Sequence, residues 1–271
     1  MPELPDVETM RRYLQSTALH KEIKGVRVHA ADILPSNEEV EGTTVEELKG
    51  ALVGHSLAST RRHGKYLFVA LEGGKGVLVL HFGMTGGLSY FKDMADEPDH
   101  DCVLFQFSNG YQLAYHAMRR LGEVALIDDV DRFVAEKGLG PDALDADFDL
   151  AAFKEAVRGR RAMVKSLLMD QQTMAGIGNV YADEILFHAE IHPRTKVNKL
   201  DETQLEELFH TLKDVLQTAI DHQAEPETFP GDFIGSHRHE GGRCPRCGTE
   251  LERVKVSGRS AYFCPNRQQK E

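Results

Sequence analysis

The spacing of apolar residues changes once along this 271-residue chain, and this change constrains the fold more than any other feature. Between Lys24 and Ile127 the sequence consists mainly of short runs rich in β-branched and aromatic residues, separated by glycines, which is typical of strands and turns. From Leu205 to Ile220 the apolar residues instead recur every three or four positions, which predicts a helix with one buried face. We therefore expect an α+β protein whose strands precede its main helix.

The expected elements divide the chain into several parts. We expect strands at Lys65–Leu71, Gly76–Phe82, Val103–Phe107 and Tyr111–Tyr115, and helices at Val7–Thr17 and Thr44–Ala51. The segment Asp128–Asp149 contains two glycines and a proline and has the composition of a linker. We predict an N-terminal domain at 1–130, a linker at 131–150, a helical domain at 151–240 and a C-terminal hairpin at 241–271.

The charge of the chain argues in two directions. The formal net charge is −11, which counts against a generally basic nucleic-acid-binding protein. The cations nevertheless occur in groups, at Arg11-Arg12, Arg61-Arg62 with Lys65, Arg119-Arg120, and Arg158, Arg160, Arg161 with Lys165. If the fold gathers these groups, they can form a local positive groove on an acidic body; otherwise they are scattered, solvated charges.

No part of the sequence predicts a membrane protein or a secreted one. The chain has no apolar run of about 18 residues and no hydrophobic secretory segment at its start, so we expect a cytoplasmic protein. In that reducing compartment, cysteines are metal ligands or free thiols more often than disulfides. Three of the four cysteines, Cys244, Cys247 and Cys264, lie close in sequence and are therefore interpreted as metal ligands.

The first residues could form a catalytic group. If the initiator Met1 is removed, Pro2 carries a free secondary amine that can attack a sugar aldehyde carbon and form an iminium. Glu3 beside it could move the protons that opening a sugar ring requires. If Met1 is retained, the Pro2 nitrogen is a tertiary amide and cannot react in this way. The tripeptide alone is a weak signal.

A second candidate site is the Gly-Ile-Gly-Asn turn at 176–179. Gly176 and Gly178 would let backbone N–H groups approach a ligand closely. We expect Asn179 to be the N-cap of the following helix, where its side chain and the first N–H groups could hold a phosphate. The alternative is a simple connection between two helices.

Five stretches, in this order along the chain, resemble motifs of the formamidopyrimidine-DNA glycosylase and endonuclease VIII family, and the N-terminus is closer to the formamidopyrimidine-DNA glycosylase branch. They are Met-Pro-Glu-Leu-Pro-Asp-Val-Glu-Thr at the start, Arg-Arg-His-Gly-Lys-Tyr-Leu at 61–67, His-Phe-Gly-Met-Thr-Gly at 81–86, the segment 168–184 around the Gly-Ile-Gly-Asn turn, and Gly-Arg-Ser at 258–260 followed by Cys264-Pro265. The resemblance implies an N-terminal β-sandwich with flanking helices, a helix–two-turn–helix domain and a zinc-finger-like β-hairpin, with DNA clamped between the two halves.

The resemblance also assigns catalytic roles. It implies that the Pro2 amine attacks C1′ of the damaged nucleotide, expels the base and forms the iminium. Glu3 would protonate the sugar ring oxygen and assist elimination, and Lys65 would contact the phosphate next to the lesion. The protein would then be a base-excision repair DNA glycosylase with abasic-site lyase activity on oxidised bases. The alternative is a non-catalytic protein that binds lesions or abasic sites with the same clamp.

Other residues are expected to contact double-stranded, damaged DNA, with the protein acting as a monomer. His100, Asn179 and Arg259 match groups that hold the DNA backbone, and we expect the same of Lys165, from the last cation group. Chemistry on a base inside a duplex requires that nucleotide to be extruded, which leaves a gap in the stack. Met84, Arg119 and Leu121 match the side chains that fill this gap.

The sequence departs from the family in two places. Arg267 stands where the family has the fourth cysteine of the hairpin, although structural zinc usually takes four ligands. The set could be completed by His237, His239 or water, or the hairpin could fold without metal. In addition, Ala117-Met118 replaces Asp-Pro, Leu121 replaces phenylalanine, and the loop at 225–240 looks short. The preferred lesion, 8-oxoguanine, a formamidopyrimidine or an oxidised pyrimidine, therefore stays open.

Overall fold

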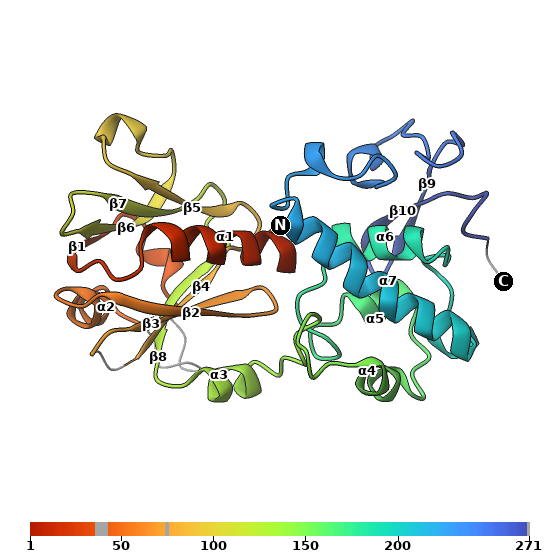
Figure 1. The fold of residues 1–271 in the computed structure, drawn as a ribbon, viewed down its shortest axis with the longest axis horizontal. Helices are drawn as coiled ribbons and strands as arrows, with labels where there is room; N and C mark the ends of the chain where they lie inside the picture. Colours follow the sequence, from red (N-terminus) through yellow and green to blue (C-terminus); the bar gives the residue numbers. More distant parts are fainter. Residues whose placement is uncertain (36–42, 74–75, 270–271) are drawn as a thin grey trace. The chain divides into compact units, whose positions relative to one another are not determined.

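The computed structural model describes residues 1–35, 43–73 and 76–269 (Figure 1). The chain forms two compact units. Unit 1 comprises Met1–Pro2 and Asp6–Lys137, and unit 2 comprises Glu3–Pro5 and Gly138–Glu271. The predicted division at 1–130, 131–150, 151–240 and 241–271 is finer than these two units and stays a prediction.

Unit 1 is built from two four-stranded antiparallel sheets, with strand orders β1-β6-β7-β5 and β2-β3-β4-β8. The strands are β1 (Ile23–Val28), β2 (Leu57–His63), β3 (Tyr66–Leu71), β4 (Val77–His81), β5 (Gly86–Phe91), β6 (Asp101–Phe107), β7 (Gln112–Ala117) and β8 (Glu123–Ile127). The helices are α1 (Leu4–Thr17), α2 (Val45–Leu52) and α3 (Val130–Glu136), with 3₁₀ turns η1 (Ala31–Ile33) and η2 (Met94–Asp96). The four expected strands and two expected helices are present, with small shifts at their ends.

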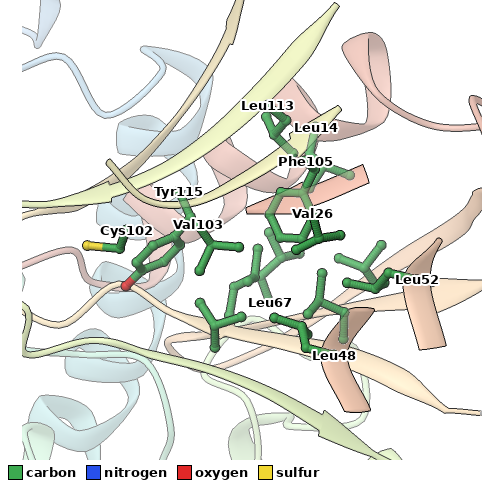
Figure 2. Close-up of a cluster of buried hydrophobic side chains, with 14 of the residues drawn as sticks. Leu14, Val26, Leu48, Leu52, Leu67, Cys102, Val103, Phe105, Leu113 and Tyr115 are labelled. Carbon is green, nitrogen blue, oxygen red and sulfur yellow. The ribbon is translucent and has the colours of Figure 1, made fainter. Parts of the chain in front are cut away.

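The two sheets and two of the helices share one apolar core. Leu67 of β3, Phe105 of β6 and Tyr115 of β7 meet Leu14 of α1 and Leu48 of α2 in it (Figure 2). Strands alternate the direction of successive side chains, so each sheet keeps a second face. On the second face of the β2-β3-β4-β8 sheet, Phe133 of α3 packs edge-on against Phe68. Helix α3 therefore covers this face of the sheet. It lies in the segment 128–149, whose composition is that of a linker.

Unit 2 is helical and ends in a two-stranded hairpin. Its helices are α4 (Leu150–Val157), α5 (Val164–Leu168), α6 (Asn179–His188) and α7 (Glu202–Asp221), with 3₁₀ turns η3 (Val197–Lys199), η4 (Pro226–Thr228) and η5 (Gly235–His237). Its strands are β9 (Glu252–Val256) and β10 (Arg259–Phe263). The apolar stripe of α7 is buried against α4, α5 and α6, as its spacing predicts. In the described part of the chain, no helix has the length and apolarity needed to cross a membrane.

The hairpin turn follows from its two central residues. Ser257 and Gly258 both have a positive φ, 46° and 79°. Two successive positive φ values characterise the tight turn whose twist matches that of an antiparallel strand pair. The turn sets Arg259 opposite Val256, at the exposed tip of the hairpin. The structure confirms the α+β class, with an N-terminal β-sandwich, a helical domain and a C-terminal hairpin.

Candidate active site and nucleic-acid interface

The Glu3 side chain is buried at the N-terminus of helix α6. It is 2 % exposed, and its carboxylate accepts hydrogen bonds from the backbone N–H groups of Gly178, Val180 and Tyr181 at 2.8, 2.9 and 3.2 Å. These N–H groups have no partner inside the helix, and the helix dipole places partial positive charge there. Three backbone N–H donors thus hold the carboxylate in one position. Since Pro2 is bonded directly to Glu3, this also restricts where the Pro2 nitrogen can lie.

The two glycines of the 176–179 turn make room for the start of the chain. A Cβ on Gly178 would lie 2.3 Å from the Glu3 carboxyl carbon, and a Cβ on Gly176 would lie 2.5 Å from a Leu4 methyl group. Gly176 also has a φ of 117°, and its carbonyl accepts from the Leu4 N–H at 3.0 Å. Close approach of backbone to a ligand was expected of these glycines, but here they approach Glu3 and Leu4 of the same chain.

The prediction that Asn179 caps helix α6 is wrong by one residue. Gly178 is the N-cap, and Asn179 is the first helical residue. The Glu3 carboxylate accepts from the Tyr181 N–H, which is one of the groups that an Asn179 cap would have satisfied. Asn179 Oδ1 is buried and has no hydrogen-bond partner among the described residues. The Asn179 amide is therefore not used for capping.

A buried ionic cluster joins the helices of unit 2 to the hairpin. Lys165 of α5 and Asp183 of α6 are both completely buried at their side chains and lie 2.6 Å apart. Asp183 also accepts from Arg238 at 2.7 Å and from the Tyr262 backbone N–H at 3.2 Å. Lys165 in turn donates to the Ser260 carbonyl at 2.7 Å. Burial lowers the pKa of the Lys165 ammonium from its ordinary value, and Asp183 opposes this shift.

The cluster changes the interpretation of Lys165. A phosphate contact was expected of it, but its ammonium is inside the protein and its bonds go to Asp183 and Ser260. It holds strand β10, which carries Arg259 as its first residue. Asp183 and Arg238 were not singled out from the sequence. Asp183 lies beside Glu184 on a buried helix, and a buried carboxylate requires a compensating partner.

In unit 1, the strand registers bring five predicted residues to one end of the sandwich. The pairs that close the sheets at this end are His63–Tyr66, Tyr66–His81 and His81–Glu123 in one sheet and Gly86–Ala117 and Asp101–His116 in the other. Short crossings from β4 to β5 and from β7 to β8 connect the two sheets here. The predicted residues lie in the adjoining turns: Lys65, Met84, His100, Arg119 and Leu121.

We call the two crossings, residues 82–85 and 118–122, the crossing loops. They pack backbone against backbone, because a Cβ on Gly83 would lie 2.4 Å from the Leu121 carbonyl carbon, and the Arg119 N–H donates to the Thr85 hydroxyl at 3.1 Å. Exposed apolar side chains project from them: Met84 is 39 % exposed, Leu121 55 % and Met118 66 %. Met118 belongs to this apolar group as well, although it was not predicted to be a site residue.

Lys65 lies beside a histidine that stays neutral. Burial, the nearby Lys65 charge and Lys137 lower the pKa of His81 to about 4. His81 therefore adds no positive charge near neutral pH, and Lys65 and Lys137 are cations close to it. Lys65 itself is 8 % exposed.

Several cations that the sequence grouped together are engaged in ion pairs. Glu8 accepts from Arg11 at 2.7 Å and Arg12 at 3.0 Å and lies 3.4 Å from Arg62. Although burial raises the pKa of Glu8, these cations hold it below its ordinary value. Arg119 and Arg259 are exposed and form no ion pair with the rest of the described chain. They are the arginines of the predicted site that are free to meet an external anion.

The three clustered thiols lie in the arrangement of a metal site. The ligand atoms of Cys244, Cys247 and Cys264 lie within 4.8 Å of one another, and the sulfurs of Cys247 and Cys264 are 3.5 Å apart. Neither His237 nor His239 joins this group in the described part of the chain. Three sulfur donors suit zinc, which favours thiolates, and no other described side chain supplies the fourth ligand.

Comparisons with known proteins agree along the whole chain. Residues 1–124 match the formamidopyrimidine-DNA glycosylase N-terminal domain, 139–229 the helix–two-turn–helix domain of the same enzyme, and 241–266 the zinc finger found in FPG and IleRS. The formamidopyrimidine-DNA glycosylase of Pelotomaculum thermopropionicum is 35% identical and that of Pelobacter propionicus 37%. The matches cover 98% of both chains for the first, and 99% of this chain and 100% of the relative for the second.

The chain belongs to the formamidopyrimidine-DNA glycosylase family. Two solved structures are similar to it over 99% of this chain and 100% of their own, each at 32% identity and a TM-score of 0.86. One is MutM in complex with DNA containing carbocyclic 8-oxo-G, and the other is Lactococcus lactis FPG (MutM) with DNA containing FAPY-dG. The family resemblance inferred from five motifs is thus confirmed, and so is a structural zinc site of the glycosylase-type finger, carried here by three cysteines.

Proposed function

We propose that the protein is a base-excision repair DNA glycosylase with abasic-site lyase activity, and that Pro2 is its nucleophile. The observation that carries this proposal is the Glu3 carboxylate, held by three N–H groups at the start of α6 and bonded to the residue that supplies the amine. Membership in a glycosylase family and two similar proteins in complex with lesion-containing DNA support it.

The chemistry divides between the two first residues. With Met1 removed, the Pro2 nitrogen attacks C1′ of the damaged nucleotide, the bond to the base breaks, and the amine and sugar form an iminium. Glu3 takes the proton that the attacking amine loses, delivers it to the sugar ring oxygen as the ring opens, and accepts the C2′ proton as the phosphate is eliminated. The carboxylate can serve in both steps because its position is fixed by backbone groups, which do not titrate.

The DNA contacts divide between the two units. Lys65 and His100 of unit 1 and Asn179 and Arg259 of unit 2 hold phosphates, and the crossing loops enter the space that the extruded nucleotide leaves. We propose that Lys165 does not touch DNA but positions β10 for Arg259. The substrate is a double-stranded DNA with an oxidised base, bound by one copy of the protein. We place this reaction in the cytoplasm, where free thiols such as those of the hairpin persist.

Zinc takes no part in the reaction. When bound by Cys244, Cys247 and Cys264, it would stabilise the base of the hairpin. The chemistry that the chain requires, a nucleophilic amine and a mobile proton, comes from Pro2 and Glu3.

Borohydride trapping tests the proposal. The protein with Met1 removed is mixed with duplexes carrying an oxidised purine, a formamidopyrimidine, an oxidised pyrimidine or an abasic site, and a covalent adduct is expected with at least one of them. Pro2→Gly should lose the adduct and strand cleavage while it still binds a duplex with an abasic-site analogue, since affinity comes mainly from phosphate contacts. If the wild-type protein without Met1 binds these duplexes tightly but forms no adduct with any of them, it is a non-catalytic lesion-binding protein.

A further inference from the structure

Side chains, rather than a fourth thiol, hold the C-terminal arm of the hairpin to the end of helix α6. The Arg267 guanidinium donates to the carboxylate of Glu190, two residues beyond the last residue of α6. Gln268 is 1 % exposed, accepts from the Cys264 N–H at 2.9 Å and donates to the Ile191 carbonyl at 2.9 Å. These contacts connect the turn after Cys264 directly to the segment after α6.

The same arginine lies beside the thiols. Arg267 is close enough to Cys244 and Cys247 for their charges to act on its guanidinium. Its Nε–H is buried and has no hydrogen-bond partner among the described residues. A buried donor of this kind needs an acceptor, and a thiolate or a small molecule bound beside the thiols would supply one. Arg267 stands three residues after Cys264, at the sequence position of a fourth ligand. In the fold it therefore lies on the side of the thiol group where that ligand would be.

The base of the hairpin also has apolar packing of its own. Cys244 and Cys264 are buried in a cluster with Phe187 of α6, Ile234 and Leu251. The Leu251 N–H donates to the Gly242 carbonyl at 2.8 Å, which closes the strand-like segment before β9. These contacts do not depend on metal, which a small finger usually needs in order to fold.

We propose that the Arg267–Glu190 ion pair and Gln268 replace the fourth metal ligand as the anchor of this hairpin. Two consequences follow. The hairpin keeps its fold when zinc is absent, and zinc bound by the three cysteines has a fourth position that takes an exchangeable small donor, water or a free thiol. A site with three protein ligands and one open position is ordinarily found in catalytic zinc centres, not in structural ones.

The open position is tested by metal binding to the full chain. Cobalt(II) bound to the wild-type protein should change its visible absorption spectrum when a small thiol is added, because the thiol enters the fourth position. Arg267→Cys supplies a fourth thiolate, so its cobalt spectrum should not respond to added thiol. Its zinc affinity, measured by competition with a chromophoric chelator, should rise by about tenfold or more. A wild-type spectrum that is insensitive to thiol, or an unchanged zinc affinity in Arg267→Cys, would overturn the proposal.

The anchor is tested by hydrogen exchange at the β9 and β10 amides in zinc-free protein. The wild-type hairpin should stay protected, and in Glu190→Gln the same amides should exchange faster. The matched control is Glu155→Gln, which removes the exposed pair with Arg158 in the same unit and should leave the hairpin unchanged. Loss of protection in the zinc-free wild type, or equal protection in Glu190→Gln and the control, would refute the anchor. Neither measurement uses catalysis, so both are independent of the proposed function.

Discussion

Glu3 and Asp183, two of the buried carboxylates at helix α6, are compensated in different ways. Glu3 receives three backbone N–H groups, whereas Asp183 receives the Lys165 ammonium and the Arg238 guanidinium. Burying a carboxylate without such partners is strongly unfavourable, so each is held in one place. The first arrangement fixes the carboxylate by backbone groups, which do not titrate, and this suits a group that exchanges protons. The second neutralises the charge and suits a structural role.

Replacing Glu3 by Gln should separate the two reactions of the enzyme. The amide keeps the size of the side chain but cannot exchange a proton, and a proton-transfer residue contributes about 10²–10⁴-fold to a rate. We expect base excision to slow by about 100-fold or more while covalent trapping on a preformed abasic site continues, because there no base has to leave. Single-turnover kinetics on both substrates measures this. If both activities fall equally, Glu3 is not the proton shuttle.

His81 should make the stability of unit 1 depend on pH. Its pKa in the folded protein, about 4, lies below the ordinary value of 6.5. The unfolded chain therefore binds a proton that the folded chain does not, so this contribution is fully present above about pH 6.5 and is lost as the pH falls toward about 4. The difference corresponds to on the order of 3 kcal/mol.

The measurement is urea unfolding at pH 7 and pH 4.5 for the wild type and His81→Asn. The free energy of unfolding should fall more with acidification in the wild type than in the variant. The comparison is between the two pH slopes, since the substitution also changes packing against Tyr66 at all pH values. Equal slopes would show that His81 is protonated in the folded state as readily as in the unfolded chain.

At the scale of elements, strand β10 is positioned by α5 and α6 through the Lys165–Asp183 pair. Asp183→Asn removes the charge that compensates Lys165 and Arg238, and breaking a buried pair costs about 3–5 kcal/mol. We expect faster hydrogen exchange in β10 and weaker binding to abasic-analogue duplex, comparable to the loss in Arg259→Ala. Both variants should bind less well than Arg158→Ala, which removes an exposed, paired cation. Full binding by Asp183→Asn would show that β10 needs no anchor of this kind.

At the scale of the whole molecule, a net charge of −11 must coexist with binding to a polyanion. The cations Arg11, Arg12 and Arg62 are held by Glu8, so the predicted groove cannot draw on every cation group. We take Lys65, Arg119 and Arg259, the cations of the predicted site other than Lys165, as the candidates to neutralise phosphates. Each phosphate neutralised contributes about −0.9 to the slope of log affinity against log salt concentration.

We therefore expect a slope of roughly −3 for an abasic-analogue duplex, measured by fluorescence anisotropy over a range of salt concentrations. Arg259→Ala should reduce the slope by about one, because one cation is removed. Arg61→Ala, which removes an exposed arginine paired with Asp131, should leave it unchanged. A slope near zero would contradict binding through phosphate contacts.

The class of fold, the family and most of the site could be predicted from the sequence. Local patterns contain this information: strand and helix periods, a proline and glutamate at the start, glycines in a turn and three clustered cysteines. The five unit 1 candidates were found as separate motifs. That they lie at one end of the sandwich follows from the registers of β3, β4, β5, β7 and β8, which no local pattern specifies.

Tertiary structure alone decided which polar groups are available. Lys165 looks like any cation of a basic run, yet it is buried because Asp183 and Ser260 lie where its ammonium reaches. Asn179 looks like a helix cap, yet the carboxylate of Glu3, 176 positions earlier, takes that place. Periodicity depends on neighbours in the chain, and can be recognised from sequence. The partner of a buried charge is set by contacts between distant residues, and is known only when the chain is folded.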